Sequence, residues 1–162
     1  MRLLPSCVVA ALVFIVSVAA DGNVAHSPMT VKASVAADCS VQSPQSIDFG
    51  TYSAGSTSDT TTDALQIACT KGASGVTVAL DNGQNYSGGH RAMRGTGGSS
   101  AVYYEIYTAS ARNIIWNRTQ TVTYVPTSGQ PGKLTLYGRV VGATSNLVAG
   151  NYTDTLTAMV NF

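Results

Sequence analysis

Charged residues are scarce in this sequence: only 10% of its 162 positions are Asp, Glu, Lys or Arg, and Glu105 is its one glutamate. Paired carboxylates of the kind that glycosidases use are therefore hard to assemble. Neither His26 nor His90 has a second His or Cys at metal-ligand spacing. The serines form no G-x-S-x-G elbow, and the glycine-rich stretch 87–100 lacks the phosphate-binding G-x-x-x-x-G-K-[ST] pattern. We therefore expect that the protein is not an enzyme, that it has no catalytic residue, and that it binds no metal or cofactor.

The first twenty residues are typical of a secretory signal peptide. Arg2 precedes an apolar run over residues 8–18, and small residues lead to an expected cut between Ala20 and Asp21. The run is too short for a permanent membrane helix. Its removal lowers the Lys and Arg count from 9 to 8, equal to the 8 Asp and Glu. A net charge near zero favours neither nucleic acid nor an anionic membrane as a partner, so we expect a secreted protein that is not inserted in a membrane.

Two cysteines remain after the expected cut, Cys39 and Cys69. In an exported chain, two cysteines most simply form one disulfide. Closing a loop of about 30 residues contributes roughly 3–4 kcal/mol in the chain-entropy model. We expect this bridge, with two free thiols as the alternative.

Alternation of apolar and polar residues is the dominant pattern, and it predicts half-buried strands. It is clearest at the two ends of the mature chain, over residues 29–41 and 155–162. Shorter candidate strands between these ends cover residues 65–70, 76–80, 102–108, 121–125 and 134–141. Turn-forming sequences separate them, and no helical periodicity of useful length is present. The pattern indicates one all-β domain, most simply a β-sandwich.

Two polar stretches are expected outside the strands. Residues 53–63 are rich in threonine and predict a loop or a sheet edge. Residues 87–100 are rich in glycine and contain His90, Arg91 and Arg94, so they predict a mobile surface loop.

The N-terminal alternating segment is too long for an ordinary first strand. Residues 29–41 would extend for about 43 Å at roughly 3.3 Å per residue. One solution divides the segment: the part near Cys39 belongs to its own domain, and the upstream part adds as a strand to another molecule. The alternative is that residues 24–35 fold back on their own domain or fray. The last strand also exposes a pairing edge, because no later strand follows it.

Several ordered motifs carry a resemblance to a known family. They cover nearly the whole mature chain: residues 33–41 with their cysteine, 47–52 (IDFGTY), 103–107 (YYEIY) followed by Arg112 and Trp116, 136–140 (LYGRV), and 150–162. Together they resemble the spore coat protein U domain, a family that includes subunits of archaic chaperone–usher pili.

The resemblance implies an incomplete immunoglobulin-like β-sandwich of Greek-key topology that lacks its last strand. A periplasmic chaperone would first supply the missing strand, and at an outer-membrane usher the N-terminal segment of an identical or related subunit would replace it. The resemblance also fits the Cys39–Cys69 bridge. On this sequence it assigns residues 21–35 as a donor extension and residues 36–162 as the pilin domain. The donor face would be Met29, Val31, Ala33 and Val35, and the acceptor edge Leu156, Ala158, Val160 and Phe162.

The expected function is thus a structural subunit of a surface pilus, reached through the periplasm. Two alternatives stay open. One is a coat protein of a spore or cyst with the same fold. The other is a single-domain adhesin or carbohydrate-binding module, in which aromatic residues form a sugar-binding platform: Tyr103, Tyr104, Tyr107 and Trp116.

Overall fold

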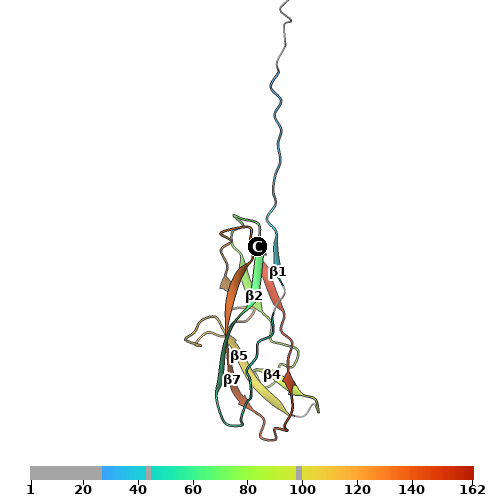
Figure 1. Ribbon diagram of the computed structural model, residues 1–162, viewed down its shortest axis with the longest axis vertical. Coiled ribbons are helices and arrows are strands. Elements are labelled where there is room, and N and C mark those ends of the chain that lie inside the picture. Colours follow the sequence, from blue (N-terminus) through green and yellow to red (C-terminus); the bar gives the residue numbers. More distant parts are fainter. Residues whose placement is uncertain (1–26, 43–44, 98–99) are drawn as a thin grey trace, which may run out of the picture. The chain divides into compact units, whose positions relative to one another are not determined.

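The computed structural model describes residues 27–42, 45–97 and 100–162, and these residues form β-strands and no helix (Figure 1). Residues 27–34 belong to one unit and residues 35–162 to another. The expected signal peptide, and residues 21–26 of the expected extension, lie outside the described residues. Within the described residues, no helix is long and apolar enough to cross a bilayer. The strands are β1 (Cys39–Gln42), β2 (Ser58–Cys69), β3 (Thr77–Leu80), β4 (Arg91–Gly95), β5 (Ala101–Tyr107), β6 (Val122–Thr123), β7 (Gly132–Ala143), β8 (Tyr152–Thr153) and β9 (Ala158–Asn161).

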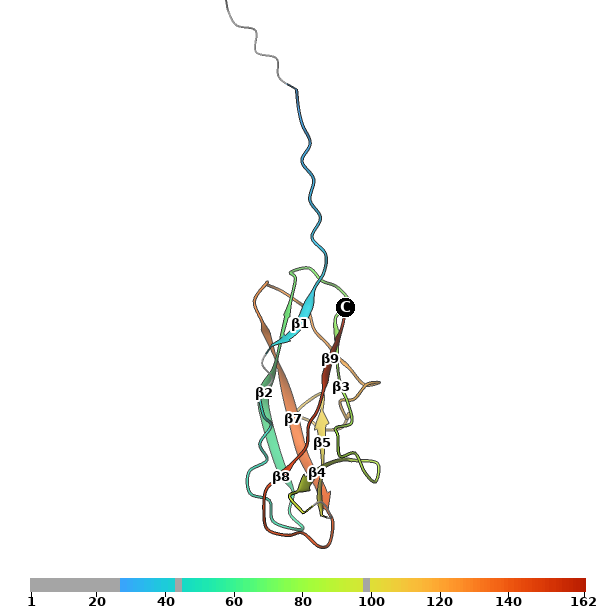
Figure 2. The same cartoon turned by 90° about the vertical axis from the view of Figure 1, so that its right-hand side faces the viewer.

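Two antiparallel sheets make up residues 35–162 (Figures 1 and 2). The larger sheet has the order β1-β2-β7-β5-β4-β8, and the smaller has the order β6-β3-β9. Both β8 and β9 belong to the last stretch of chain, which therefore leaves one sheet at Thr153 and joins the other at Ala158. The expectation of an all-β fold is confirmed.

The core lies between the sheets and is built from the inward-facing residues of alternating strands. Ile67, Ile106 and Leu136 of the larger sheet pack with Val78 and Leu80 of the smaller one. Trp116 follows β5 and is fully buried; its indole N–H donates to the carbonyl of Val78 at 2.8 Å. This hydrogen bond satisfies the polar end of a large core side chain.

The glycine-rich stretch 87–100 differs from its expectation as a mobile loop. It contains β4, which pairs with both β5 and β8, and Arg91 at its start is only 1% exposed. The Arg91 guanidinium donates to the carbonyls of Asp81 and Trp116, at 2.6 Å each, and pairs with Glu105. A buried arginine is tolerated when its donors are satisfied, so the short strand is held by polar bonds that a hydrophobic pattern does not reveal.

The threonine-rich stretch 53–63 also differs in part. β2 begins at Ser58, seven residues before the candidate strand that starts at Leu65. Residues 58–62 pair with β7, and the register shifts between Thr62 and Leu65. The boundary was misplaced because residues 58–63 (SDTTTD) contain no apolar residue, so the start of the strand shows no alternation of apolar and polar residues.

The expected disulfide is present and joins β1 to β2. Cys39 and Cys69 are direct partners in the antiparallel register, with sulfurs bonded and a separation of 30 residues along the chain. Next to the bridge, the Thr70 N–H donates to the carbonyl of Asp38 at 2.8 Å. The four-residue β1 is thus held to the sheet by a covalent bond as well as by its backbone hydrogen bonds to β2.

The double substitution Cys39→Ala/Cys69→Ala is expected to lower the free energy of unfolding by about 3–4 kcal/mol, because the unfolded chain regains the entropy of an open 30-residue loop. Urea-induced unfolding of residues 21–162, followed by circular dichroism, measures this. The wild-type protein in reductant is the control and should lose a similar amount. Equal midpoints for all three samples would show that the bridge adds nothing to stability.

Candidate functional site

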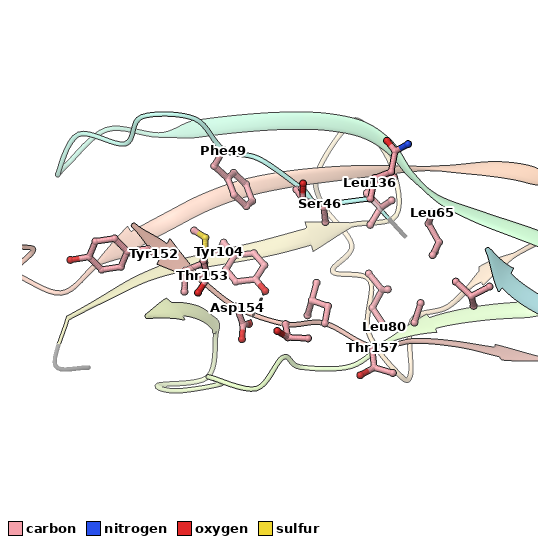
Figure 3. Close-up of a pocket in the computed structure, with 18 residues that line it drawn as sticks. Ser46, Phe49, Leu65, Leu80, Tyr104, Leu136, Tyr152, Thr153, Asp154 and Thr157 are labelled. Carbon is pink, nitrogen blue, oxygen red and sulfur yellow. Dashed lines mark hydrogen bonds between the residues drawn. The ribbon is translucent and has the colours of Figure 1, made fainter. Parts of the chain in front are cut away.

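An open groove runs between the first and last parts of the domain (Figure 3). Val41 of β1 and residues 45–49 line one side, residues 152–158 line the other, and the cavity has a volume of about 770 Å³. β1 and β9 lie near one another although they belong to different sheets. The groove therefore opens at the seam where the sandwich is not closed by a strand.

The two ends of the groove differ in chemistry. Figure 3 shows Phe49, Tyr104 and Tyr152 toward one end and the aliphatic side chains of Leu65, Leu80 and Leu136 toward the other. The rings of Phe49 and Tyr104 are 5.7 Å apart and tilted by 59°. Aromatic side chains thus fill the floor at one end, and aliphatic side chains line the other.

The backbone of the last strand is paired on one side only. The carbonyls of Thr155 and Thr157 accept hydrogen bonds from the N–H groups of Gln84 and Asp81, on the side of β3. Backbone groups of successive residues in a strand point to opposite sides. Those of Leu156, Ala158 and Val160 therefore point away from β3, and none has a backbone partner among the described residues on that side. Leu156 and Ala158 line the groove there.

The opposite wall of the groove has the same property. In β1, the Asp38 carbonyl accepts from Thr70, and Ser40 and Gln42 face Ala68 and Gln66 in β2. The alternate residues Cys39 and Val41 direct their backbone groups away from β2 by the same alternation. In the described part of the chain β1 is the terminal strand of its sheet, so an apolar groove is bordered by two unpaired strand edges.

Asp154 fixes the chain where it passes from β8 to β9. Its carboxylate accepts hydrogen bonds from the Tyr104 hydroxyl at 2.8 Å and from the backbone and side-chain N–H groups of Asn85, at 3.1 Å each. Burial, and then the hydrogen bond to Asp154, raise the pKa of Tyr104 far above its usual value. Tyr104 is therefore a neutral donor at any physiological pH.

Asp81 performs a similar role at Thr157, three residues after Asp154. Its Oδ1 accepts from the N–H of Gly83 at 3.0 Å and from the N–H of Thr157 at 2.9 Å. Burial alone would raise the pKa of Asp81, but the backbone donors Thr157 and Gly83 stabilise the charged form and the net pKa lies below its usual value. The loop after β3 thus holds the groove-lining stretch at two positions.

Tyr152 anchors the other end of this stretch. Its hydroxyl donates to the carbonyl of Val148 at 2.8 Å and accepts from the N–H of the same residue at 3.1 Å. This pattern resembles the tyrosine corner of β-sandwiches, in which a strand tyrosine bonds to backbone a few residues upstream. The strand is therefore held rigid where it enters the groove wall.

The predicted site residues fall into two groups. Leu156, Ala158 and Val160 are half-buried and pack against the core beside the groove, and Phe162 is 55% exposed. Met29, Val31, Ala33 and Val35 join no sheet in the structure, and three of them are more than four-fifths exposed. Their assignment as donor and acceptor residues stays a prediction.

Sequence reasoning missed Asp154 and its partners Asn85 and Tyr104, together with the wall formed by Ile47 and Phe49. Two motifs of the family resemblance contain these residues: IDFGTY contains Ile47 and Phe49, and the motif over residues 150–162 contains Asp154. The resemblance gave neither motif a role in the site.

The aromatic residues considered as a sugar-binding platform do not form one. Tyr104, Tyr107 and Trp116 are at most 9% exposed and belong to the interior. The described residues also contain no group of three or more His, Cys, Asp or Glu side chains that could hold a metal ion.

Gly83→Ala is expected to disrupt the Asp154 anchor. Gly83 has a φ of +79°, and a Cβ there would collide with the Asp154 carboxylate. Gly88→Ala is a matched control, because Gly88 has a φ of +61° and open space around its Cα. In both variants the free energy of unfolding should fall by about 1–2 kcal/mol, because an alanine must adopt a left-handed conformation. In Gly83→Ala it should fall by about 2 kcal/mol more, because hydrogen bonds to the charged Asp154 are lost. Urea unfolding measures both variants. Equal losses would contradict the anchor.

Asp81→Asn tests the charge on Asp81 while it keeps an acceptor oxygen. The lowered folded-state pKa stabilises the protein above the unfolded pKa of about 3.9, and this contribution disappears as the pH falls through the folded pKa. The variant should be less stable than the wild type by about 1 kcal/mol near pH 7, and the difference should vanish near pH 2. A difference that is the same at both pH values in urea unfolding would contradict this role.

The Spore Coat Protein U domain matches residues 25–159. Among solved structures, the chain is similar to a chain in the CsuC–CsuE chaperone–tip adhesion subunit pre-assembly complex from archaic chaperone–usher Csu pili of Acinetobacter baumannii. The identity is 26% and the TM-score 0.52, over 79% of this chain and 40% of that one. The present chain thus spans less than half the length of the chain that it matches in the Csu complex. A complex described as a chaperone–tip adhesin of CFA/I fimbriae biogenesis matches at 15% identity and a TM-score of 0.48, over 75% of this chain and 40% of that one.

No curated protein sequence matches the chain significantly. The likeness to the Csu complex agrees with an incomplete immunoglobulin-like sandwich, and proteins of this kind are structural and not enzymes. With the family matched over residues 25–159, the chain belongs to the Spore Coat Protein U domain family.

Proposed function

We propose that the protein is a structural subunit of a surface pilus and polymerises by donor-strand complementation. The residues 29–35 of one copy fill the groove of the next. One observation carries this proposal: the groove is bordered on both sides by strand edges whose backbone groups are unpaired among the described residues. An added strand bonds to an edge of this kind through its own backbone N–H and C=O groups.

The donor segment has the chemistry that such a groove requires. Met29, Val31 and Val35 are 85%, 83% and 85% exposed. Each gains about 1.5–3 kcal/mol if it is fully buried. The alternate residues Thr30, Lys32 and Ser34 are polar and suit the solvent-facing side of an added strand.

The open groove also accounts for the proposed partners. A subunit with an apolar groove and free edges is prone to aggregation until the groove is covered. A periplasmic chaperone would cover it first, and an outer-membrane usher would be the place where the extension of another subunit replaces the chaperone. The likeness to a chaperone–subunit complex supports this route. The expected signal peptide supports export, so the assembled protein lies at the cell surface.

A spore or cyst coat is the alternative context for the same assembly. The family carries that name, and strand exchange would operate in either context. Imaging separates them, because pili appear as fibres that extend from the cell and a coat appears as a continuous layer.

Val31→Asp is expected to abolish assembly, because it places an unpaired charge in an apolar groove at a cost of about 3 kcal/mol or more. That cost corresponds to about a 100-fold loss or more in binding. Thr30→Asp is the matched control: it adds the same charge at the neighbouring residue, whose side chain faces solvent. Fibre yield by electron microscopy and by SDS-resistant ladders measures both variants.

Deletion of residues 21–35 provides an independent check. The truncated subunit should remain as a chaperone-bound monomer, since its own groove is intact while it has no strand to donate. Fibres from the truncated protein, or equal loss of assembly in Val31→Asp and Thr30→Asp, would show that the donor assignment is wrong.

A further inference from the structure

The groove and the extension have matching lengths. Residues 152–158 line the groove, and four of them, at alternate positions, turn inward: Tyr152, Asp154, Leu156 and Ala158. Residues 29–35 also number seven and present four alternate residues, Met29, Val31, Ala33 and Val35. At roughly 3.3 Å per residue, each set extends for about 20 Å. One segment can therefore cover the other without a gap or an excess.

The geometry of the two edges determines which donor residues pair directly with this wall. Leu156 and Ala158 direct their backbone groups into the groove, as the bonds of Thr155 and Thr157 to the loop after β3 require. Residues directly opposite one another in an antiparallel pair have side chains on the same face. The inward-facing donor residues must therefore lie opposite the inward-facing residues of the wall.

The direction of the donor strand follows from the ends of the domain. Figure 2 shows β1 and the C-terminus at one end and β8 at the other. A donor that runs antiparallel to β9 enters with its own domain beyond the β8 end. The β1 end of one copy then meets the β8 end of the next, and this head-to-tail contact repeats without limit. A parallel donor would bring two β1 ends together and would end the chain at two copies.

We propose that the donor strand binds in one register, in which Met29 lies opposite Ala158, Val31 opposite Leu156, Ala33 opposite Asp154 and Val35 opposite Tyr152. This inference rests on the proposed function and specifies how the groove recognises a second copy of the chain.

Side-chain size selects this register. Asp154 lies at the end of the groove where the rings of Tyr104 and Phe49 fill the floor. Alanine, the smallest residue of the donor face, fits there. At the aliphatic end the order is reversed, because the long Met29 faces the small Ala158. A slip of two residues in either direction places a valine opposite Asp154 and moves Ala33 away from the aromatic end.

Pro28 agrees with the same register. It has no N–H and cannot complete a ladder. In the proposed register it lies opposite Met159, one residue beyond the stretch that lines the groove. A slip of two residues toward the β8 end would bring Pro28 opposite Thr157, inside the groove. Pro28 thus disfavours a slip toward the β8 end, and a slip the other way would place Val35 opposite Asp154.

Cysteine cross-linking within assembled fibres tests the register. Each subunit carries Leu156→Cys together with one donor substitution: Met29→Cys, Val31→Cys or Ala33→Cys. Directly opposed residues have Cα atoms about 5.5 Å apart, within disulfide range, whereas diagonal residues are about 7–8 Å apart. Only Val31→Cys should give fibres whose subunits stay linked, and run as a ladder of bands on a gel, after boiling in SDS without reductant. The yield of linked subunits should be at least about tenfold above that of the other two variants. Met29→Cys with Ala158→Cys is the second matched pair, used if Leu156→Cys lowers assembly.

The outcomes separate the two proposals. Bridging by Met29→Cys or Ala33→Cys, in place of Val31→Cys, overturns the register and leaves donor-strand complementation intact. Fibres that form normally but give no bridge with either acceptor position overturn both, because the groove is then not the binding site. As a second measurement, Ala33→Leu should lower fibre yield about tenfold or more through overpacking, whereas Ser34→Leu, at the neighbouring position whose side chain faces solvent, should have little effect. Equal yields for these two variants contradict the size argument.

Discussion

Two strand edges, unpaired on one side among the described residues, are the constraint that governs the rest of this structure. β1 and the stretch before β9 border the same groove, and both direct backbone groups into it. Such groups are costly to bury without partners. Under the proposed donor-strand complementation, a strand of another subunit would supply those partners. The bonds that complete the sandwich would then also be the bonds that join two subunits.

The polar contacts around the groove explain how an incomplete sandwich keeps its shape. Asp154, Asp81 and Tyr152 each tie the last stretch of chain to a different part of the domain. Arg91 and Trp116 do the same across the interior. With these bonds in place the groove wall is preorganised. A donor strand of the proposed kind would meet an edge already extended, which would reduce the entropy lost on binding.

Alternation in the sequence predicted the parts of the fold that depend on burial. The last strand, the strand over 134–141 and the Cys39–Cys69 bridge follow from apolar periodicity and cysteine number. β4 was missed because Arg91 and the glycines around it gave no apolar signal, and a buried ion pair with Glu105 holds it in place. The Asp154 anchor could not be predicted either, since it joins Asn85 to a residue 69 positions away, and only the fold brings them together.

The disulfide has a mechanical consequence in a fibre built by donor strands. Tension along such a fibre enters each subunit through the short connection that ends at Cys39. β1 has four residues, and its ladder alone would peel under load, one pair at a time. The bond from Cys39 to Cys69, with the adjacent bond from Thr70 to Asp38, transfers that load to the twelve-residue β2 and through it to β7. In such a fibre the subunit would bear tension through its longest paired strands, and its first strand would be a covalently fastened link.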